Sequence, residues 1–370
     1  MSLFLTIFLS VYTLLHLIFY RAVRCLLPSG HGSRVVLGLF LFLMILAPVI
    51  TVIAGYRGYF GLARLMGTVG YWWMGYLLMA LLCLLALDLL RLGALPFSPK
   101  PWDWRMPMSL ALGAAFLITA YAGYAATDIR LKHLIIPTSK LPAGVERLVI
   151  AQTTDLHLGL PEGMSRLSKV LKLVEKAHPD LWIDTGDMWD RPLLDVNQLV
   201  AMMRRVDPPL GKYMIAGNHE NYVGLGTSFE LSRAAGFTVL HNHGQAAGPL
   251  YLAGVGDSRR VHPEWDAAAM AHSDPSRLTI FLRHRPLFNQ DYAAKVDLQL
   301  SGHTHGGQVW PAHLITSRIF PYFAGLYHPA KGALLYTSRG TGTWGPPMRL
   351  FSPPEVTVIT LVRDPAQASR

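Results

Sequence analysis

Four long apolar stretches occupy the first third of the chain, at about residues 3–20, 35–54, 71–90 and 108–125. Each is long enough to cross a bilayer as a helix, which requires about 20 residues. Arginine, glycine or proline bounds each stretch, so the pattern predicts an all-α membrane region over residues 1–130 with four transmembrane helices. A cleaved signal peptide is the alternative for the first stretch, but that stretch lacks a basic leader and a small-residue cleavage site.

Basic residues in the short loops predict the orientation of these helices. Loops 21–34 and 91–105 each contain three basic residues, whereas the N-terminal tail has none and loop 55–70 has two. This distribution places the first and third loops in the cytoplasm and the chain beyond residue 130 outside it. Arg130, Lys132 and Lys140 favour the opposite orientation. We expect a multi-pass protein of the inner (cytoplasmic) cell membrane with an extracytoplasmic C-terminal domain.

Beyond residue 130 the apolar runs become short. Residues 131–145 contain two prolines and a glycine, which predicts a linker. Strand-like runs then alternate with helical patterns, which predicts an α/β domain over residues 146–364 and a C-terminal tail at 365–370. The predicted strands cover residues 147–152, 181–184, 212–216, 250–255, 278–282, 296–300, 333–338 and 355–361. The predicted helices between them include residues 161–177 and 194–206.

Charge and cysteine content indicate which binding partners and which types of active site the chain can have. Lys and Arg total 33 against 23 Asp and Glu, and nine of the basic residues but only three of the acidic ones lie up to Arg130. Basic residues that flank apolar stretches suit an anionic membrane surface, and no basic stripe with interleaved aromatics predicts a nucleic-acid partner. Cys25 and Cys83 both belong to the membrane region, which excludes a cysteine-ligated metal or a cysteine nucleophile in the C-terminal domain.

Polar residues follow five of the predicted strands at the point where each strand ends. They are carboxylates, imidazoles and one amide, namely Asp155, His157, Asp187, Asn218, His219, His284, His303 and His305. Because the carboxyl ends of strands meet in one crevice of an open α/β sheet, we expect these side chains to lie together. They are ligand types for divalent first-row metals. A single histidine beside an apolar strand is more often a structural polar residue, but five such segments in order favour a metal site.

With these motifs the chain resembles the calcineurin-like metallophosphoesterase superfamily over about residues 146–362. The segments 155–159, 186–188, 301–309, 346–349 and 353–355 are similar to a membrane-anchored bacterial branch. The resemblance implies a four-layer αββα sandwich that holds two divalent metal ions. It favours manganese, with iron, zinc or magnesium as alternatives.

The resemblance also implies a role for each residue. One ion would be held by Asp155, His157, Asp187 and His305. The other would be held by Asp187, Asn218, His284 and His303, so that Asp187 bridges the two. His219 matches the catalytic position that faces the substrate phosphate. The family often has Asp after this histidine, where the chain has Glu220, a longer carboxylate that can still orient the imidazole.

These roles predict a metal-dependent phosphohydrolase or phosphodiesterase. Two ions about 3.5–4 Å apart would supply a bridging hydroxide that attacks phosphorus, and His219 would protonate the leaving oxygen.

The membrane region, its basic flanks and the apolar stretch 313–328 favour a lipid or lipid-linked phosphate or pyrophosphate ester as substrate. That stretch is either a flap packed over the sheet or a lip in contact with lipid. Two alternatives are a tethered phosphodiesterase for a soluble substrate and a membrane sensor or scaffold with a binding-only metal site. The sequence predicts no oligomeric state.

Overall fold

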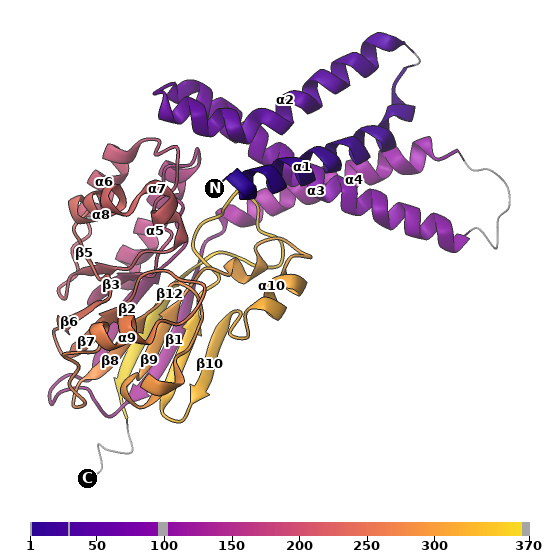
Figure 1. The fold of residues 1–370 in the computed structure, drawn as a ribbon. Helices are drawn as coiled ribbons and strands as arrows, with labels where there is room; N and C mark the ends of the chain where they lie inside the picture. The colour runs from indigo at the N-terminus through magenta and orange to yellow at the C-terminus, as the bar shows by residue number, and fades with distance from the viewer. Residues whose placement is uncertain (1, 29, 95–102, 365–370) are drawn as a thin grey trace. The chain divides into compact units, whose positions relative to one another are not determined.

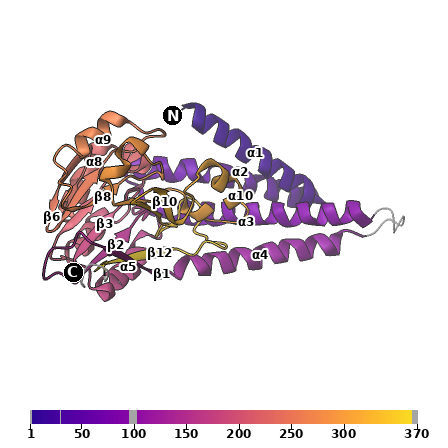
Figure 2. The same cartoon turned by 90° about the horizontal axis from the view of Figure 1, so that it is seen from below.

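The computed structural model describes residues 2–28, 30–94 and 103–364 (Figures 1 and 2). Contacts divide the chain into two compact units, of which the first comprises the chain up to Tyr124 together with Gly345–Met348. The second comprises the chain from Ala125 to Trp344 and from Arg349 onward. The predicted C-terminal tail at 365–370 lies outside the described residues.

The first unit contains the four predicted membrane helices. They are α1 (Ser2–Val23), α2 (His31–Tyr56), α3 (Phe60–Ala94) and α4 (Arg105–Thr127), with a short 3-10 turn, η1, at Arg24–Leu26. All four are long and apolar enough to cross a membrane, as the sequence predicts. The helix α3 begins eleven residues before the predicted stretch, because its start is set by a turn at Gly58 rather than by hydrophobicity.

Small residues allow close packing inside this unit. A Cβ placed on Gly70 of α3 would lie 2.6 Å from the Cβ of Ala47 in α2, so the two helix backbones approach each other closely at this point. Such small-residue contacts are typical of helices that pack within a bilayer. His16 of α1 is also used in packing, because its Nε2 accepts a hydrogen bond from Trp73 Nε1 of α3 at 2.9 Å.

Two six-stranded sheets form the second unit. The first has the order β1-β12-β2-β3-β4-β5. Its strands are β1 (Arg130–Thr138), β12 (Glu355–Arg363), β2 (Arg147–Thr153), β3 (Leu181–Asp184), β4 (Lys212–Met214) and β5 (Phe237–Val239). The second has the order β10-β11-β9-β8-β7-β6. Its strands are β10 (Gly325–Ala330), β11 (Ala333–Thr337), β9 (Leu298–Ser301), β8 (Leu278–Leu282), β7 (Leu250–Gly254) and β6 (His243–Ala247).

Helices cover the outer faces of both sheets, which completes the predicted αββα arrangement (Figure 1). They are α5 (Gly163–Ala177), α6 (Val196–Arg204), α7 (Asn218–Val223), α8 (Leu225–Ala234) and α9 (Pro263–Ala269). The unit also contains α10 (His313–Ile319), which has no buried residue, and the 3-10 turns η2 (Gln290–Lys295) and η3 (His305–Gly307). Alternate side chains of a strand point to opposite faces. Leu181 and Ile183 of β3 therefore join the core between the sheets, while Trp182 packs under α5 and α6.

The structure adds four strands that the sequence pattern did not indicate. The predicted linker contains β1, which pairs in parallel with β12 from Arg130↔Glu355 to Thr138↔Arg363. Only Ile136 of β1 is fully buried, so this edge strand lacks the apolar alternation that identifies a strand. The strands β5, β6 and β10 are also short or lie at a sheet edge. The second unit thus starts before residue 146, and two residues, Asp128 and Ile129, separate the end of α4 from the start of β1.

Candidate metal centre

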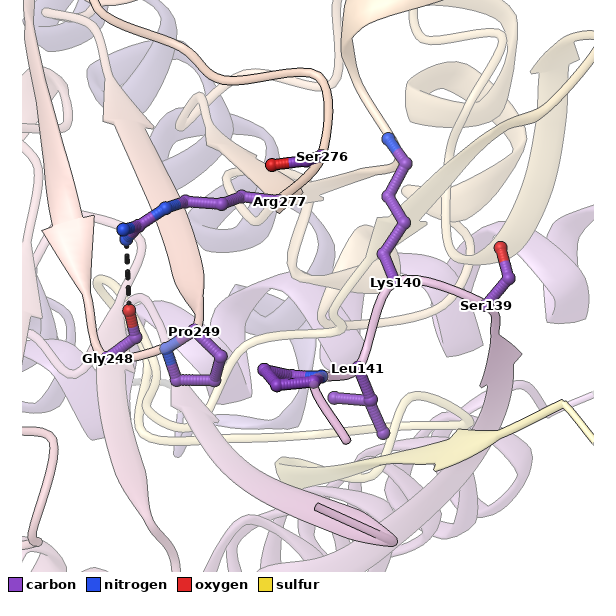
Figure 3. A pocket seen from close by; sticks show the side chains of 8 residues that line it. Ser139, Lys140, Leu141, Gly248, Pro249, Ser276 and Arg277 are labelled. Atoms are coloured by element: carbon purple, nitrogen blue, oxygen red, sulfur yellow. Dashed lines mark hydrogen bonds between the residues drawn. The ribbon is translucent and has the colours of Figure 1, made fainter. Parts of the chain in front are cut away.

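A pocket of about 350 Å³ lies at the carboxyl end of β1 and the amino ends of β7 and β8 (Figure 3). Its lining includes Lys140, which follows β1, and Arg277, which directly precedes β8. Both cations already have partners, because Lys140 Nζ lies 2.8 Å from Asp297 Oδ1 and Arg277 donates to the Gly248 carbonyl at 3.1 Å. None of the candidate residues from the sequence lines this pocket.

The candidate residues gather at the opposite edge, where the strands end. The parallel strands β2, β3 and β4 of one sheet and β8 and β9 of the other each lead into one of the five motifs. Since the two sheets pack face to face, loops from both meet at this edge. The predicted convergence of five separate segments is therefore present in the tertiary structure.

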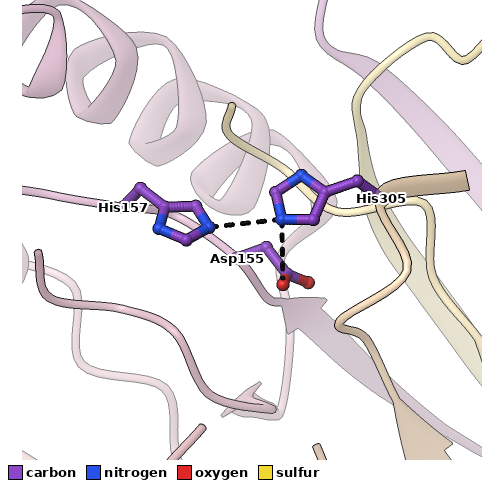
Figure 4. Close-up of side chains that lie close together, drawn as sticks. All are labelled: Asp155, His157 and His305. Atoms are coloured by element: carbon purple, nitrogen blue, oxygen red, sulfur yellow. Dashed lines mark hydrogen bonds and ion pairs between the residues drawn. The ribbon is translucent and has the colours of Figure 1, made fainter. Parts of the chain in front are cut away.

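The first cluster consists of Asp155, His157 and His305, whose ligand atoms lie within 4.8 Å of one another (Figure 4). Nε2 of His157 and Nε2 of His305 are 3.2 Å apart. Nε2 of His305 also lies 3.3 Å from Asp155 Oδ1. The side chains of Asp155 and His157 are fully buried and that of His305 is 11% exposed, so the cluster is largely shielded from water.

The second cluster consists of Asp187, His284 and His303. Nε2 of His284 lies 3.2 Å from Asp187 Oδ2 and 3.2 Å from His303 Nδ1. The other ring nitrogen of His284 lies 2.8 Å from the Thr185 carbonyl, which can only accept a hydrogen bond. This contact assigns the proton of the imidazole to Nδ1 and leaves Nε2 as a donor of an electron pair to a metal.

Asp187 lies between the two clusters. It also forms a group with His157 and His219, again with ligand atoms within 4.8 Å of one another. Its Oδ1 accepts the backbone N–H of His219 at 2.8 Å, while its Oδ2 faces His284. The carboxylate therefore points toward ligand atoms of both clusters, which is the arrangement that a bridging carboxylate requires.

Asn218 lies on the side of the second cluster and contacts it through Arg285. Nη2 of Arg285 donates to Asn218 Oδ1 at 3.2 Å, and Nη1 of the same guanidinium is 2.7 Å from His303 Nε2. Nε of Arg285 in turn donates to Asp257 Oδ1 at 2.9 Å. Arg285 and Asp257 were not among the candidate residues from the sequence. The only local signal is that Arg285 follows His284 directly.

The backbone is strained at most of the candidate ligands. Positive φ angles occur at Asp155 (55°), His157 (47°), Asp187 (56°), His303 (71°) and His305 (51°). This left-handed region is uncommon for residues other than glycine, and such strain is concentrated at functional sites. The sharp turns aim carboxylates and imidazoles back over the strand ends instead of away from them.

Two glycines make the close approach of the loops feasible. A Cβ on Gly217 would overlap the carboxylate of Asp187, and a Cβ on Gly302 would overlap Thr154 Oγ1 and the carboxylate of Asp155. Each backbone therefore lies against a candidate ligand at a distance that no side chain permits.

The electrostatics of the clusters match the protonation states that a metal requires. Burial raises the pKa of Asp155 and Asp187, but neighbouring imidazoles outweigh it and hold both pKa values well below the usual range. Burial lowers the pKa of His303 to about 2 and that of His305 to about 4. Ionised carboxylates and neutral imidazoles are the forms that bind divalent cations.

His284 differs from the other imidazoles. Burial disfavours its charged form, but the carboxylate of Asp187 outweighs burial and raises the pKa of His284 to about 10. A divalent cation between the two side chains would take the place of this proton. The buried donor set of carboxylates, imidazoles and one amide thus fits hard or borderline divalent metals.

Asp190 is a residue of this site that the sequence did not single out. Its Oδ2 lies 3.1 Å from Nδ1 of His219 and 3.2 Å from Nδ1 of His157. Burial opposes the charge on His219, but Asp190 and Asp187 outweigh it and raise the pKa of His219 to about 9. The available signal was the position of Asp190 three residues after Asp187 in the same loop.

The expectation that Glu220 orients the imidazole of His219 is wrong. The carboxylate of Glu220 instead accepts backbone N–H groups from Gly217 at 2.7 Å, Asp187 at 2.9 Å and Trp189 at 2.9 Å. Glu220 is the third residue of α7, and its side chain turns back to the helix start, as in a capping box. It therefore fixes the loops that carry Asp187 and Asn218.

Arg349 is buried and has a packing role. Its Nη1 donates to the carbonyls of His305 at 2.8 Å and Arg339 at 2.7 Å, and its Nε donates to the Gly342 carbonyl at 3.1 Å. Burial lowers its pKa to about 9. Because backbone carbonyls take up its donors, the guanidinium holds the loop of His305 in place.

Aromatic side chains flank the centre. The ring of Trp344 lies 5.7 Å from that of His219, and the ring of Tyr222 lies 5.2 Å from it. Phe320 stands 5.2 Å from His303. Trp344 and Tyr222 are more than half exposed, so a molecule that reaches His219 from solvent must pass apolar surface.

Comparison with known proteins gives consistent matches. The calcineurin-like phosphoesterase family matches residues 148–307. An uncharacterized metallophosphoesterase of Aquifex aeolicus (strain VF5) is 36% identical over 255 residues, which are 67% of this chain and 97% of that protein. One of Bacillus subtilis (strain 168) is 33% identical over 277 residues, with 68% and 93% covered. A transmembrane protein with metallophosphoesterase domain of Danio rerio is 31% identical over 259 residues, but only 58% of that protein is covered.

Proposed function

The chain belongs to the calcineurin-like phosphoesterase family of metal-dependent phosphoric ester hydrolases, and we propose that it is a dinuclear-metal phosphodiesterase for a membrane-bound substrate. The observation that carries the dinuclear part is the position of Asp187, whose carboxylate faces ligand atoms of two clusters. One ion would be held by Asp155, His157, Asp187 and His305. The second would be held by Asp187, Asn218, His284 and His303.

Bound divalent ions would supply Lewis-acid activation of water and neutralise the charge of the phosphate oxygens. We propose manganese, and iron, zinc or magnesium suit the same ligands. Arg285, 3.2 Å from Asn218 Oδ1, adds a fixed positive charge beside the second cluster that favours an anionic substrate. The aromatic rings of Trp344 and Tyr222 shield His219 from bulk water.

His219 is the proposed catalytic residue of the chain itself. A pKa of about 9 keeps its imidazole protonated at neutral pH, so it can donate a proton to the leaving oxygen. The contact of 3.1 Å between its Nδ1 and Asp190 holds the ring, which leaves Nε2 as the atom for proton donation. Asp190 acts as a positioning residue through this contact.

A test of the enzyme assignment measures hydrolysis of a methyl aryl phosphodiester by the full chain in detergent with added Mn²⁺. Asp187→Ala should reduce turnover by at least about 10²-fold, because charge stabilisation at the centre is lost. It should also reduce the bound metal measured by elemental analysis. The matched control is Glu175→Ala, an exposed carboxylate of α5, which should change neither quantity. A native chain that binds metal and hydrolyses no phosphodiester would favour the sensor or scaffold alternative.

Two observations support the proposal of a membrane-bound substrate. Four helices are long and apolar enough to cross a bilayer, and the second unit follows them directly in the chain. Confinement near a bilayer raises the effective concentration of a lipid substrate. We expect hexadecyl p-nitrophenyl phosphate in proteoliposomes to be cleaved with a kcat/KM at least about tenfold above that of methyl p-nitrophenyl phosphate. Equal values would favour the tethered enzyme for a soluble substrate.

The proposal also concerns the side of the membrane on which the catalytic domain lies. The loop charges favour an extracytoplasmic catalytic domain in the inner membrane of a bacterial cell. Two reporters fused after Arg370 test it, one that is active only outside the cytoplasm and one that is active only inside. Activity of the cytoplasmic reporter alone would reverse the orientation and with it the accessible class of lipid substrate.

A further inference from the structure

Exposed apolar side chains lie on and next to α10, the helix that follows the motif of His303 and His305. We call this group the α10 ridge, and its members are Trp310, Leu314, Ile315, Ile319 and Phe351. Ile315, Ile319 and Phe351 are 67%, 62% and 80% exposed. Ile315 and Ile319, four residues apart, share one face of the helix. The backbone N–H of Trp310 donates to the Leu350 carbonyl at 3.2 Å, which places Phe351 beside the start of the ridge.

The stretch 313–328 has two parts: residues after α10 contact the loop of the metal centre, and α10 itself is exposed. Phe320 packs 5.2 Å from the ring of His303, and the carbonyl of Phe323 accepts the Thr304 hydroxyl at 2.7 Å. The helix itself has no buried residue. The stretch 313–328 is therefore not a flap packed over the sheet along its whole length, since its helix presents leucine and isoleucine to solvent. Contiguous exposed apolar surface on a soluble domain marks an interaction site.

The charge around the ridge identifies the kind of partner. No acidic residue occurs in the sequence between Asp297 and Glu355, whereas Arg318 and Lys331 lie within that stretch. Arg339 also lies within it, but its guanidinium is paired with Glu355 Oε2 at 2.7 Å. Arg318 is exposed on α10 itself. An apolar helix face in a stretch of chain that has basic and no acidic residues is complementary to the anionic headgroups and acyl region of a lipid bilayer.

Chain connectivity keeps the domain near such a bilayer. The fourth candidate membrane span ends at Thr127 and the first strand of the catalytic unit begins at Arg130. Three residue steps of extended chain reach at most about 11 Å. A domain on so short a tether stays at the bilayer surface, where an exposed apolar ridge meets lipid at high effective concentration.

We propose that the α10 ridge is a membrane-docking surface that inserts into the interface of an anionic lipid bilayer. Docking itself does not depend on which ester is cleaved. Its catalytic consequence, that headgroup phosphates are presented to the adjoining metal centre, rests on the proposed function.

Lipid quenching tests the docking. The chain has two cysteines, Cys25 and Cys83, so Cys25→Ser and Cys83→Ser give a background for single labels. Ile315→Cys carries an environment-sensitive fluorophore, and the full chain is placed in vesicles of phosphatidylethanolamine and phosphatidylglycerol with doxyl-labelled lipid. The control is Ala271→Cys, an exposed site between α9 and β8 at the amino ends of the strands. We expect quenching at least about twofold stronger at position 315, and weaker quenching in vesicles without phosphatidylglycerol.

Equal quenching at positions 315 and 271 would overturn the proposal. So would a label at position 315 that is shielded from aqueous iodide but not quenched by lipid, since that result indicates a protein partner or a second copy. The variant Ile315→Ser with Ile319→Ser separates docking from catalysis. It should lower turnover of hexadecyl p-nitrophenyl phosphate and leave that of methyl p-nitrophenyl phosphate unchanged. If the native chain cleaves neither ester, the proposed function fails while quenching still decides the docking.

Discussion

Asp190 Oδ2 lies 3.1 Å from Nδ1 of His219 and 3.2 Å from Nδ1 of His157, so one carboxylate contacts the proposed proton donor and a proposed metal ligand together. The two rings are 4.6 Å apart and nearly perpendicular. The orientation of His219 is thus coupled to the first cluster through a residue that lies in neither of the predicted ligand sets.

Asp190→Asn should shift the pH profile of hydrolysis. Removal of the carboxylate takes away the charge that raises the pKa of His219 to about 9, so the protonated imidazole is lost at lower pH. We expect the alkaline limb of kcat/KM to move down by about one pH unit, which corresponds to about 1.4 kcal/mol of lost stabilisation of the charged form. An unchanged alkaline limb with a lower plateau would show that Asp190 has no influence on the protonation of His219.

His219→Ala should have an effect that depends on the leaving group. A proton donor matters most when the leaving oxygen is strongly basic, so the loss should reach about 10²–10⁴-fold for a phenyl ester. It should be smaller for a p-nitrophenyl ester, whose phenolate leaves without protonation. Steady-state rates on both esters, with metal content measured in parallel, check this prediction. Equal losses on both esters, or loss of metal, would contradict the role of proton donor.

Glu220→Gln should destabilise the domain. The carboxylate accepts three backbone N–H groups, from Gly217, Asp187 and Trp189, and an amide presents N–H donors to some of them. A buried donor without an acceptor costs about 1–3 kcal/mol. Thermal unfolding of the metal-free protein should show the decrease, with the exposed Glu175→Gln as its control. A variant of native stability that has lost only turnover would instead support a direct role for Glu220 at the imidazole.

Gly217→Ala should weaken metal binding. The new Cβ would overlap the carboxylate of Asp187, so either the loop or the proposed bridging ligand must move. The matched control is Gly226→Ala in α8, where a Cβ meets nothing within 4 Å. Titration with Mn²⁺ monitored by calorimetry should show two sites in the control and a loss of affinity in Gly217→Ala. Native affinity in both variants would show that the centre tolerates displacement of Asp187.

The type of chemistry was predictable from local sequence. Ligand identity and spacing, as in Asp155-Leu156-His157 and His303-Thr304-His305, are fixed by residues close together in the chain, and the strand before each motif is apolar. The parallel order of the strands then requires the motifs to meet at one edge. Long apolar stretches likewise identify membrane helices, because helix length and hydrophobicity are local properties.

The features that the sequence did not predict depend on contacts between distant segments of the chain. An exposed edge strand such as β1 has no apolar alternation, so its pairing with β12 was not visible in the pattern. The choice of Asp190 rather than Glu220 as the partner of His219 follows from the direction in which each side chain leaves its backbone. Burial of Arg349 and exposure of Ile315 are likewise set by the neighbours that tertiary structure supplies. The sequence by itself therefore determined which side chains are of metal-binding type, and only the fold decided which residues hold them in place and which apolar side chains are exposed.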